Sequence, residues 1–385
     1  MNDLKLLEQA PEQELVLTND PRDFLKQYAN GRCAVFTGGK GVEANGAWED
    51  FSGVVPGCER FSGIEPEPSI ETIEKMILFL DGGKFDSIFA IGGGSVLDAA
   101  KAALLAHQSR LELRELFGVN KFSSAFPGKE LKRIIAVPTT SGTGSEATQY
   151  ANIVDKSAGG KKLIAEAQCV PAAGCIVPRY TATMSRSVTL ATGCDALAHL
   201  MEGFLNTGAD IKHPEANNWA LTGIKLVKKY LPRALENDPE ARQQMALAAA
   251  LGGMTIRFKS TGLPHLCSFS WFGRIAHGIA AIMLLPESWR YYLGNPEVEK
   301  RTMLLQEVFP GSCAREIIDS LRQFLTDLGV PEKLSAFPDL SVELMERTAC
   351  SAGENKMKLE LAPRPVPVEQ SRPILQDILL KSYGE

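Results

Sequence analysis

The sequence predicts an α/β domain followed by an all-helical domain. In the first half, short apolar runs that are typical of buried strands end in turns, at 33–36, 85–91, 133–137 and 175–177. After about residue 180 no clear strand follows, and helical periodicity appears at 190–205, 214–230, 239–257, 278–290, 297–308, 313–328, 341–350 and 369–381. A chain of 385 residues that is 44% hydrophobic can bury two cores. We therefore expect domains at 1–180 and 181–385, with a cleft between them.

The composition excludes several classes of function. A net charge of −5 with mixed signs argues against a nucleic-acid or anionic-membrane partner. The first residues lack the apolar core of a signal peptide, and no apolar run approaches the ~18 residues of a membrane span. The 8 cysteines form no Cys-x-x-Cys pair, which favours reduced thiols over a zinc ribbon. We expect a cytoplasmic protein that acts on a small molecule.

One predicted helix carries a candidate metal site. The segment 189–202 is rich in Ala, Leu and Met, which favour a helix beginning near Thr192. Asp195 and His199 are four residues apart, so both side chains lie on one face of that helix. A buried carboxylate beside an imidazole needs a partner, and a divalent metal is one. A plain Asp–His hydrogen bond explains these two residues equally well.

Further histidines favour the metal. His265 and His277 lie in an apolar, glycine-punctuated segment that should be buried. With Asp195 and His199 they form a set of one carboxylate and three imidazoles. Such a set suits Fe(II), Zn(II) or Mn(II) and is too rich in nitrogen for Ca²⁺ or Mg²⁺. The other histidines have polar neighbours and are expected to be solvated: His107 and His213.

Two turns of the first domain are candidate cofactor sites. The strand at 85–91 runs into Gly92-Gly-Gly-Ser95 and a helix, the geometry in which backbone N–H groups bind phosphate. A tight turn without a ligand remains an alternative, because the glycine spacing matches no standard motif. The strand at 133–137 leads into a run of small hydroxyl and glycine residues, 139–145. This run can surround a polar ligand with donors, although a flexible connection has a similar composition.

Four ordered motifs resemble the iron-containing (group III) alcohol dehydrogenases. They are Gly92-Gly-Gly-Ser-x-x-Asp98-x-x-Lys101, Pro138-Thr-Thr-x-Gly-Thr-Gly-Ser-Glu146, Gly193-x-Asp-Ala-Leu-x-His-x-x-Glu202 and His277-Gly-x-x-x-x-x-Leu-Leu-Pro286. With 364–368, they span most of the chain. The resemblance implies a dinucleotide-binding domain and a helical metal domain, an architecture shared with dehydroquinate synthase. The implied reaction is metal-dependent transfer of hydride between NAD(P)(H) and an alcohol/aldehyde pair.

The resemblance also assigns residues. It makes Asp195, His199, His265 and His277 the ligands of Fe²⁺, with Zn²⁺ as an alternative, and it implies a homodimer formed through the N-terminal domain. It places the pyrophosphate at Gly93, Gly94 and Ser95, with Asp98 in the same pocket. The nicotinamide end would contact Thr139, Thr140, Thr143 and Ser145. Lys162 would face the cofactor, unless the neighbouring Lys161 does so.

The chain departs from the family pattern beside the metal. His265 and His277 are twelve residues apart, two fewer than is usual in the family, so a short deletion lies between them. Phe269 stands where many members have a further histidine that is suggested to relay protons, and Ala276 replaces a proline. These changes remove no ligand but leave the proton route unassigned. With an aromatic residue at 269, the chain resembles branches of the family that act on polar or anionic aldehydes, such as phosphonate or sugar-acid derivatives.

The end of the first core strand bears on the choice of cofactor. In the family an aspartate there binds the ribose 2′-hydroxyl, whereas this chain has Gly38, with Lys40 close behind. No carboxylate repels a 2′-phosphate, so NADP(H) is predicted to be accepted and preferred, with NAD as the alternative.

Two other functions fit the same architecture. One is a lyase or synthase like dehydroquinate synthase, which uses NAD transiently, although the loop at 138–146 argues against it. The other is a nucleotide-binding relative without turnover.

Overall fold

The computed structural model describes residues 3–385, which divide into two compact units. Unit 1 comprises the described residues up to Thr189 together with Glu236–Met254, and unit 2 comprises Leu190–Leu235 and Thr255–Glu385. These units place 236–254 with the N-terminal part, unlike the division at residue 180 that the sequence predicts. That division stays a prediction about domain organisation.

Unit 1 is built on a parallel sheet. The strand order is β1-β9-β6-β4-β2-β3, and every neighbouring pair is parallel. The strands are β1 (Glu14–Leu17), β2 (Cys33–Thr37), β3 (Glu59–Phe61), β4 (Ser87–Gly92), β6 (Ile135–Pro138) and β9 (Ala173–Ile176). A smaller sheet in the order β5-β8-β7 consists of β5 (Gly118–Val119), β8 (Gly160–Ala165) and β7 (Tyr150–Asp155).

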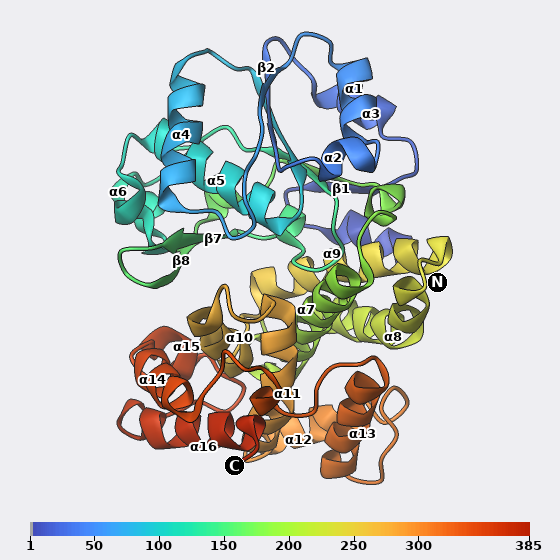
Figure 1. Ribbon diagram of the computed structural model, residues 1–385, viewed down its shortest axis with the longest axis vertical. Helices are drawn as coiled ribbons and strands as arrows, with labels where there is room; N and C mark the ends of the chain where they lie inside the picture. Colours follow the sequence, from blue (N-terminus) through green and yellow to red (C-terminus); the bar gives the residue numbers. More distant parts are fainter. Residues whose placement is uncertain (1–2) are drawn as a thin grey trace. The chain divides into compact units, whose positions relative to one another are not determined.

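Helices cover both faces of the parallel sheet (Figure 1). On one face α4 (Ile70–Asp81) and α5 (Gly94–Ser109) form a core with Ala34 and Phe36 of β2. On the other, α1 (Arg22–Tyr28) and α3 (Ala47–Val54) form a second core with Val35. A strand buried on both faces needs an unbroken apolar sequence, which is why β2 was evident from the sequence. The short helices α2 (Gly41–Ala44) and α6 (Lys121–Ala125) complete the unit.

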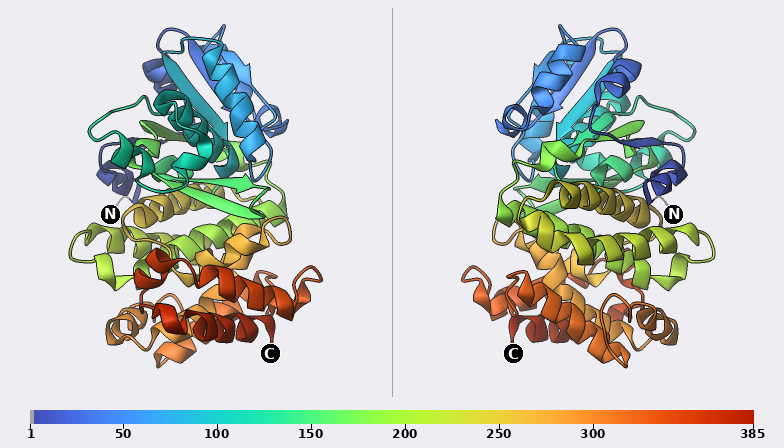
Figure 2. Two further views of the ribbon diagram at one scale, coloured as in Figure 1. Left: turned by 90° about the vertical axis from the view of Figure 1, so that its left-hand side faces the viewer. Right: turned by 90° about the vertical axis from the view of Figure 1, so that its right-hand side faces the viewer.

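Unit 2 contains helices and, within its described residues, no strand (Figure 2). Two of its helices continue from unit 1, α7 (Arg186–Leu205) and α9 (Pro239–Phe258). The others are α8 (Glu215–Leu235), α10 (Leu263–Ser268), α11 (His277–Tyr292), α12 (Pro296–Met303), α13 (Ala314–Asp327), α14 (Val342–Ala352), α15 (Lys356–Glu360) and α16 (Ser371–Tyr383). Trp271 and Trp289 are fully buried in this unit, and each indole N–H donates to a threonine hydroxyl. The predicted fold class, an α/β domain and an all-helical domain, is confirmed.

The sequence missed several elements, because they are short and most of them contain polar residues. β1 and α1 lie in 1–30 and β3 lies at 59–61, where the sequence analysis predicts no strand or helix. β7, β8, α10 and α15 were also missed. Helix α7 begins at Arg186, six residues before the predicted start at Thr192. None of the helices in the described part of the chain has the length and apolarity needed to cross a membrane.

Two histidines expected to be solvated are partly buried instead. His107 lies 3.3 Å from Asp81, and burial lowers its pKa. His213 lies 3.4 Å from Glu215, and its ring packs against Phe258. The prediction that these two rings are solvated is therefore wrong, because each ring pairs with an acidic side chain and is partly buried.

Candidate metal and cofactor sites

Three of the four predicted metal ligands face a carboxylate oxygen of the fourth, Asp195, in unit 2. Asp195 and His199 lie on α7, His265 lies on α10, and His277 begins α11. Asp195 Oδ1 is 3.9 Å from His199 Nε2, 3.5 Å from His265 Nε2 and 3.8 Å from His277 Nε2. Asp195, His199 and His265 are buried, whereas the side chain of His277 is 25% exposed. One side of the cluster is therefore open to a ligand from solvent.

The geometry of this cluster fits a metal ion better than hydrogen bonds among its members. At 3.9 Å, Asp195 and His199 are too far apart for the hydrogen bond that was the simpler interpretation of their spacing. Asp195 Oδ1 and His265 Nε2 are buried and make no hydrogen bond. Ligand atoms ~2.1 Å from a divalent metal lie roughly 3.4 Å apart in a tetrahedral shell. The distances from Asp195 Oδ1 to the three imidazoles are close to that value. The ligand atoms of Asp195, His199 and His265 all lie within 4.8 Å of one another, and this mutually close group does not include His277. The donor set suits iron or zinc.

The ionisable groups of the cluster shift one another's pKa values. Burial raises the pKa of Asp195, but the facing imidazoles His199, His265 and His277 oppose it and hold that pKa well below its usual range. Burial lowers the pKa of His265, whereas Glu202 and Asp195 raise it more strongly, to about 9. The carboxylate is thus ready to bind a cation, and protons on the imidazoles compete with that cation.

Glu202 of α7 contacts His265, one of the predicted ligands, and we did not predict this contact from the sequence. Its side chain is fully buried, and Oε1 contacts His265 Nδ1 while Oε2 accepts a 2.6 Å hydrogen bond from the Gly262 N–H. A proton on Nδ1 leaves the Nε2 lone pair pointing towards Asp195. The signal was present in the sequence, because Asp195, His199 and Glu202 follow an i, i+4, i+7 pattern along one helix face.

Ser268 and Phe269 orient His277. The Ser268 hydroxyl donates to the His265 carbonyl at 2.9 Å, so its oxygen accepts from His277 Nδ1 at 3.2 Å. The Phe269 ring stacks on the His277 imidazole with centroids 5.4 Å apart and an interplanar angle of 14°. The residue that replaces the family's further histidine therefore packs against a ligand. No proton relay follows from it.

Gly278 allows α11 to approach α7 closely. A Cβ at this position would lie 2.1 Å from the Ala191 carbonyl oxygen and 2.6 Å from Asp195 Cβ. Any larger residue would push the start of α11 away from α7. Because His277 is the preceding residue, the separation between His277 and Asp195 depends on this glycine.

In unit 1 the glycine turn and the hydroxyl-rich loop lie against each other. Gly93 and Gly94 join β4 to α5, and a Cβ on them would lie 3.2 Å from Thr140 and 2.5 Å from Thr143 respectively. The Thr139 N–H donates to the Gly92 carbonyl at 2.9 Å. Two motifs far apart in sequence thus form one surface at the carboxyl ends of β4 and β6, where α/β folds bind nucleotides.

Asp98 and Ser145, which are both predicted to bind the cofactor, form a hydrogen bond with each other. Ser145 Oγ donates to Asp98 Oδ1 at 2.6 Å, and the Asn152 N–H donates to Asp98 Oδ2 at 2.9 Å. Buried Lys101 donates to the Ser145, Thr148 and Tyr150 carbonyls at 2.6, 3.1 and 3.0 Å. This network holds the hydroxyl-rich loop against α5 and β7. That Asp98 and Ser145 contact a cofactor stays a prediction.

The two candidate lysines lie in different surroundings. Lys161 is mostly buried and forms a 2.7 Å ion pair with Glu67. The backbone N–H of Glu67 donates to Ser95 Oγ at 3.1 Å, which places Lys161 beside the glycine turn. Lys162 points to the opposite face of β8, because successive strand residues alternate, and it is exposed.

Gly38 follows β2 and contacts the same region. Its carbonyl accepts from the Gly63 N–H at 3.0 Å, and a Cβ would lie 3.4 Å from Val96 of α5. A side chain there fits after a small adjustment. Gly39 and Lys40 are exposed.

Two models of one protein family together match most of the sequence. Residues 18–177 match the iron-containing alcohol dehydrogenase model, and residues 189–379 match the C-terminal model of the same family. The chain belongs to the iron-containing alcohol dehydrogenase family. It is therefore an NAD(P)-dependent enzyme of alcohol and aldehyde oxidoreduction.

Individual alcohol dehydrogenases agree with this assignment. The chain is 31% identical to an alcohol dehydrogenase of Thermococcus barophilus, over 71% of this chain and 72% of that one. It is 32% identical to alcohol dehydrogenase 4 of Schizosaccharomyces pombe, over 76% of this chain and 70% of that one. The solved iron-containing alcohol dehydrogenase of Thermotoga maritima superimposes with a TM-score of 0.79 at 28% identity, over 96% of this chain and 98% of that one.

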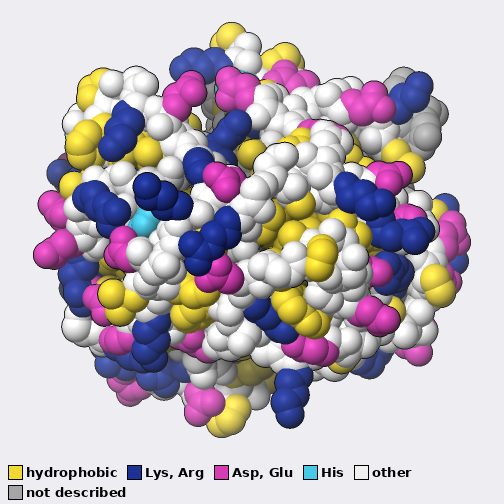
Figure 3. Space-filling view, turned by 90° about the horizontal axis from the view of Figure 1, so that it is seen from above, with side chains coloured by type: hydrophobic (Ala, Val, Ile, Leu, Met, Phe, Trp, Pro, Cys, Tyr) yellow, Lys and Arg dark blue, Asp and Glu magenta, His cyan; other side chains and the backbone are white. Residues whose placement is uncertain are grey.

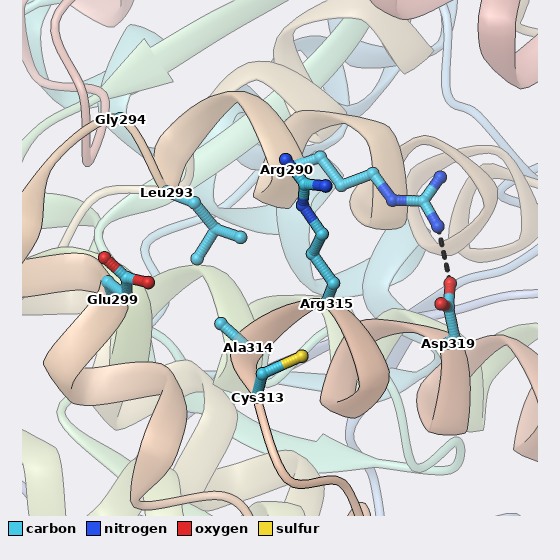
Figure 4. Close-up of a pocket in the computed structure, with 8 residues that line it drawn as sticks. All are labelled: Arg290, Leu293, Gly294, Glu299, Cys313, Ala314, Arg315 and Asp319. Carbon is cyan, nitrogen blue, oxygen red and sulfur yellow. Dashed lines mark hydrogen bonds and ion pairs between the residues drawn. The ribbon is translucent and has the colours of Figure 1, made fainter.

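A separate pocket of this alcohol dehydrogenase contains none of the predicted site residues. It measures about 800 Å³ and lies among α11, α12 and α13 of unit 2 (Figure 4). Arg290 points to Asp319 at 2.5 Å and also binds Glu287 at 2.8 Å, so its charge is neutralised within the protein. On the face drawn in Figure 3, basic and acidic side chains are interspersed among the coloured residues, in keeping with a small-molecule enzyme.

Proposed function

We propose that the chain uses a metal held by Asp195, His199, His265 and His277 to interconvert an alcohol and an aldehyde with NADP(H). The observation that carries the proposal is the convergence of three imidazole nitrogens on Asp195 Oδ1, at 3.5 to 3.9 Å. A divalent ion bound there would act as a Lewis acid on the substrate oxygen. Fe²⁺ is the ion that we propose, and Zn²⁺ suits the same donors.

The chain's own residues would prepare this chemistry. Glu202 and Ser268 hold His265 and His277 with Nε2 directed at Asp195. The stacked Phe269 ring keeps water from one face of His277, which supports a dry approach for the substrate carbon. In the absence of a histidine at 269, we propose that the substrate's proton exchanges directly with solvent beside the partly exposed His277, since both nitrogens of that ring already have partners.

In unit 1 we propose a dinucleotide site made by the glycine turn and the hydroxyl-rich loop. Gly93, Gly94 and Ser95 would bind the pyrophosphate through backbone N–H groups. Thr139, Thr140 and Thr143 have partly exposed side chains and are proposed to contact the nicotinamide end. Burial next to Glu67 and the turn supports Lys161 as the lysine that faces the cofactor, in preference to the exposed Lys162.

The substrate class can be tested directly. We propose a polar or anionic aldehyde, because an aromatic ring replaces a histidine beside the metal ligands, as in the branches of the family that the sequence resembles. Nicotinamide absorbance in the near ultraviolet, followed with simple, phosphonate-bearing and sugar-acid aldehydes and both cofactors, would rank the substrates. Faster turnover of uncharged medium-chain aldehydes than of every anionic one would overturn this part of the proposal.

Gly38→Asp should shift the cofactor preference from NADPH towards NADH. The new carboxylate would lie beside the ribose, where it repels a 2′-phosphate and accepts from a 2′-hydroxyl. We expect kcat/KM for NADPH to fall by about tenfold or more relative to NADH, which corresponds to ~1.4 kcal/mol. Steady-state kinetics with both cofactors would measure the ratio. An unmodified enzyme that strongly favours NADH, with a ratio unchanged by the substitution, would show that this strand end does not select the cofactor.

We also propose a cytoplasmic homodimer that forms through unit 1. The terminal position of β1 in the sheet supports this, because a strand at the edge of a sheet presents backbone groups that can pair with a second copy. Light scattering should give about twice the chain mass of 41.8 kDa. A mass near the single-chain value would contradict the dimer.

A further inference from the structure

The side chain of Arg60, in the middle of β3, reaches the carboxyl end of β2, where the proposed site would hold the adenosine ribose. In the parallel register Arg60 pairs with Val35 of β2, so its side chain shares a sheet face with Val35 and Thr37. Its Nε donates to Thr37 Oγ1 at 2.8 Å, and its guanidinium carbon lies 4.1 Å from the centroid of the Trp48 ring. The side chain is 19% exposed. Thr37 immediately precedes Gly38, so this guanidinium is fixed directly behind the turn.

An exposed carboxylate pairs with the Nη2 end of the guanidinium. Glu43 Oε1 lies 2.7 Å from Arg60 Nη2, and the Glu43 side chain is 45% exposed. The hydrogen bond from Arg60, together with the charge of Lys40, lowers the pKa of Glu43. The cluster therefore combines two cations with one carboxylate, and Arg60 is its least exposed member.

We propose that Arg60 recognises the 2′-phosphate of NADP(H) and that Glu43 holds the same guanidinium when no phosphate is bound. This inference rests on the proposed dinucleotide site. A phosphate monoester offers three acceptor oxygens, and a planar guanidinium binds such a group through parallel hydrogen bonds. Thr37 and Trp48 already fix the orientation of Arg60, so little side-chain freedom is lost on binding. Glu43 selects against cofactors that lack the phosphate's charge, because they cannot displace it.

The chain offers a matched control at the other end of the same two strands. Arg32 precedes β2, forms an ion pair with Glu59 at the start of β3, and has its guanidinium 4.9 Å from the Phe85 ring centroid. It therefore has an acidic partner and an aromatic neighbour, as Arg60 has. The R32Q variant removes the same charge at the amino ends of the two strands, on the Phe85 side of the sheet, whereas Arg60 lies on the Trp48 side.

The test measures the binding of two nucleotide fragments to the intact full chain by calorimetry. Adenosine 2′,5′-bisphosphate carries the 2′-phosphate, and adenosine 5′-monophosphate lacks it. R60Q should weaken the bisphosphate by about ten- to hundredfold, the range for losing hydrogen bonds to a charged group, and change the monophosphate less than about twofold. E43Q should tighten the bisphosphate several-fold, and R32Q should change neither fragment.

Each outcome decides the proposal. Equal weakening of both fragments in R60Q, an unchanged affinity for the bisphosphate, or weaker binding of the bisphosphate in E43Q would overturn the role of Arg60. If R60Q does not fold, the sign of the change in E43Q decides alone, since Glu43 is largely exposed. If the unmodified chain binds the monophosphate normally and gains nothing from the 2′-phosphate, this inference fails while the dinucleotide site stands. Binding of neither fragment would refute both.

Discussion

A His277→Ala protein should fold but retain neither its metal nor its activity. His277 Nε2 lies 3.8 Å from Asp195 Oδ1, and its removal opens the metal shell on the only side where a ligand side chain is appreciably exposed. We expect turnover to fall roughly a thousandfold or more, because several kcal/mol of transition-state stabilisation depend on the ion. Alanine is compatible with the first position of α11, so the helix should persist.

The control for this prediction is His213→Ala. His213 is partly exposed, pairs with Glu215 and packs on Phe258, and it lies outside the cluster. Metal content by elemental analysis, circular dichroism and turnover should be measured on both variants. A His277→Ala protein that is free of metal and fully active would contradict the assignment of His277 as a ligand of a catalytic metal. Equal loss of metal in His213→Ala would contradict it too.

Glu202→Gln should weaken metal binding without removing a ligand. Glutamine keeps the volume of Glu202 but loses the charge next to His265 Nδ1, and its amide cannot accept from both His265 and the Gly262 N–H as the carboxylate does. Losing an orienting partner of a metal-bound histidine typically costs 10- to 100-fold in metal affinity, so we expect about that loss. Competition with a chelator of known affinity would measure it.

Glu146→Gln is the matched control for Glu202→Gln. Glu146 is also a buried glutamate, but it lies in unit 1, and burial raises its pKa to about 7. The same chemical change there should leave metal affinity unaltered. If the two variants lose metal equally, the effect of Glu202→Gln comes from general destabilisation and Glu202 does not act through His265.

The strands that the sequence predicted are those that are buried along their whole length. β2, β4, β6 and β9 are buried along their length, and their apolar runs were recognised. β1 and β8 are only partly buried, and the exposed Glu14 and Lys162 interrupt their apolar pattern. β3 is only three residues long and partly buried throughout, so nothing in its composition separated it from a loop.

The candidate metal ligands were accessible from the sequence, whereas their supporting residues mostly were not. Asp195 and His199 follow a helical spacing, and the apolar context of His265 and His277 indicated burial. Glu202 could have been found from the same helix face. The side chains of Ser268 and His277 meet because the chain between them folds back in a short, irregular segment, and no sequence periodicity predicts such a contact. Arg60 reaches Thr37 only because β3 pairs with β2, a contact that depends on tertiary structure.

The central claim is that a metal in the Asp195 cluster enables net nicotinamide redox chemistry. The most direct test is an anaerobic titration of metal-stripped protein with Fe²⁺, in which bound iron and oxidation of NADPH by an aldehyde are measured in the same samples. We predict that turnover rises in proportion to bound iron, saturates at a single ion per chain, and consumes many equivalents of NADPH. Full turnover without metal would contradict the claim. So would an iron-loaded protein that transforms a substrate without net consumption of nicotinamide, which is the behaviour of a lyase on the same fold.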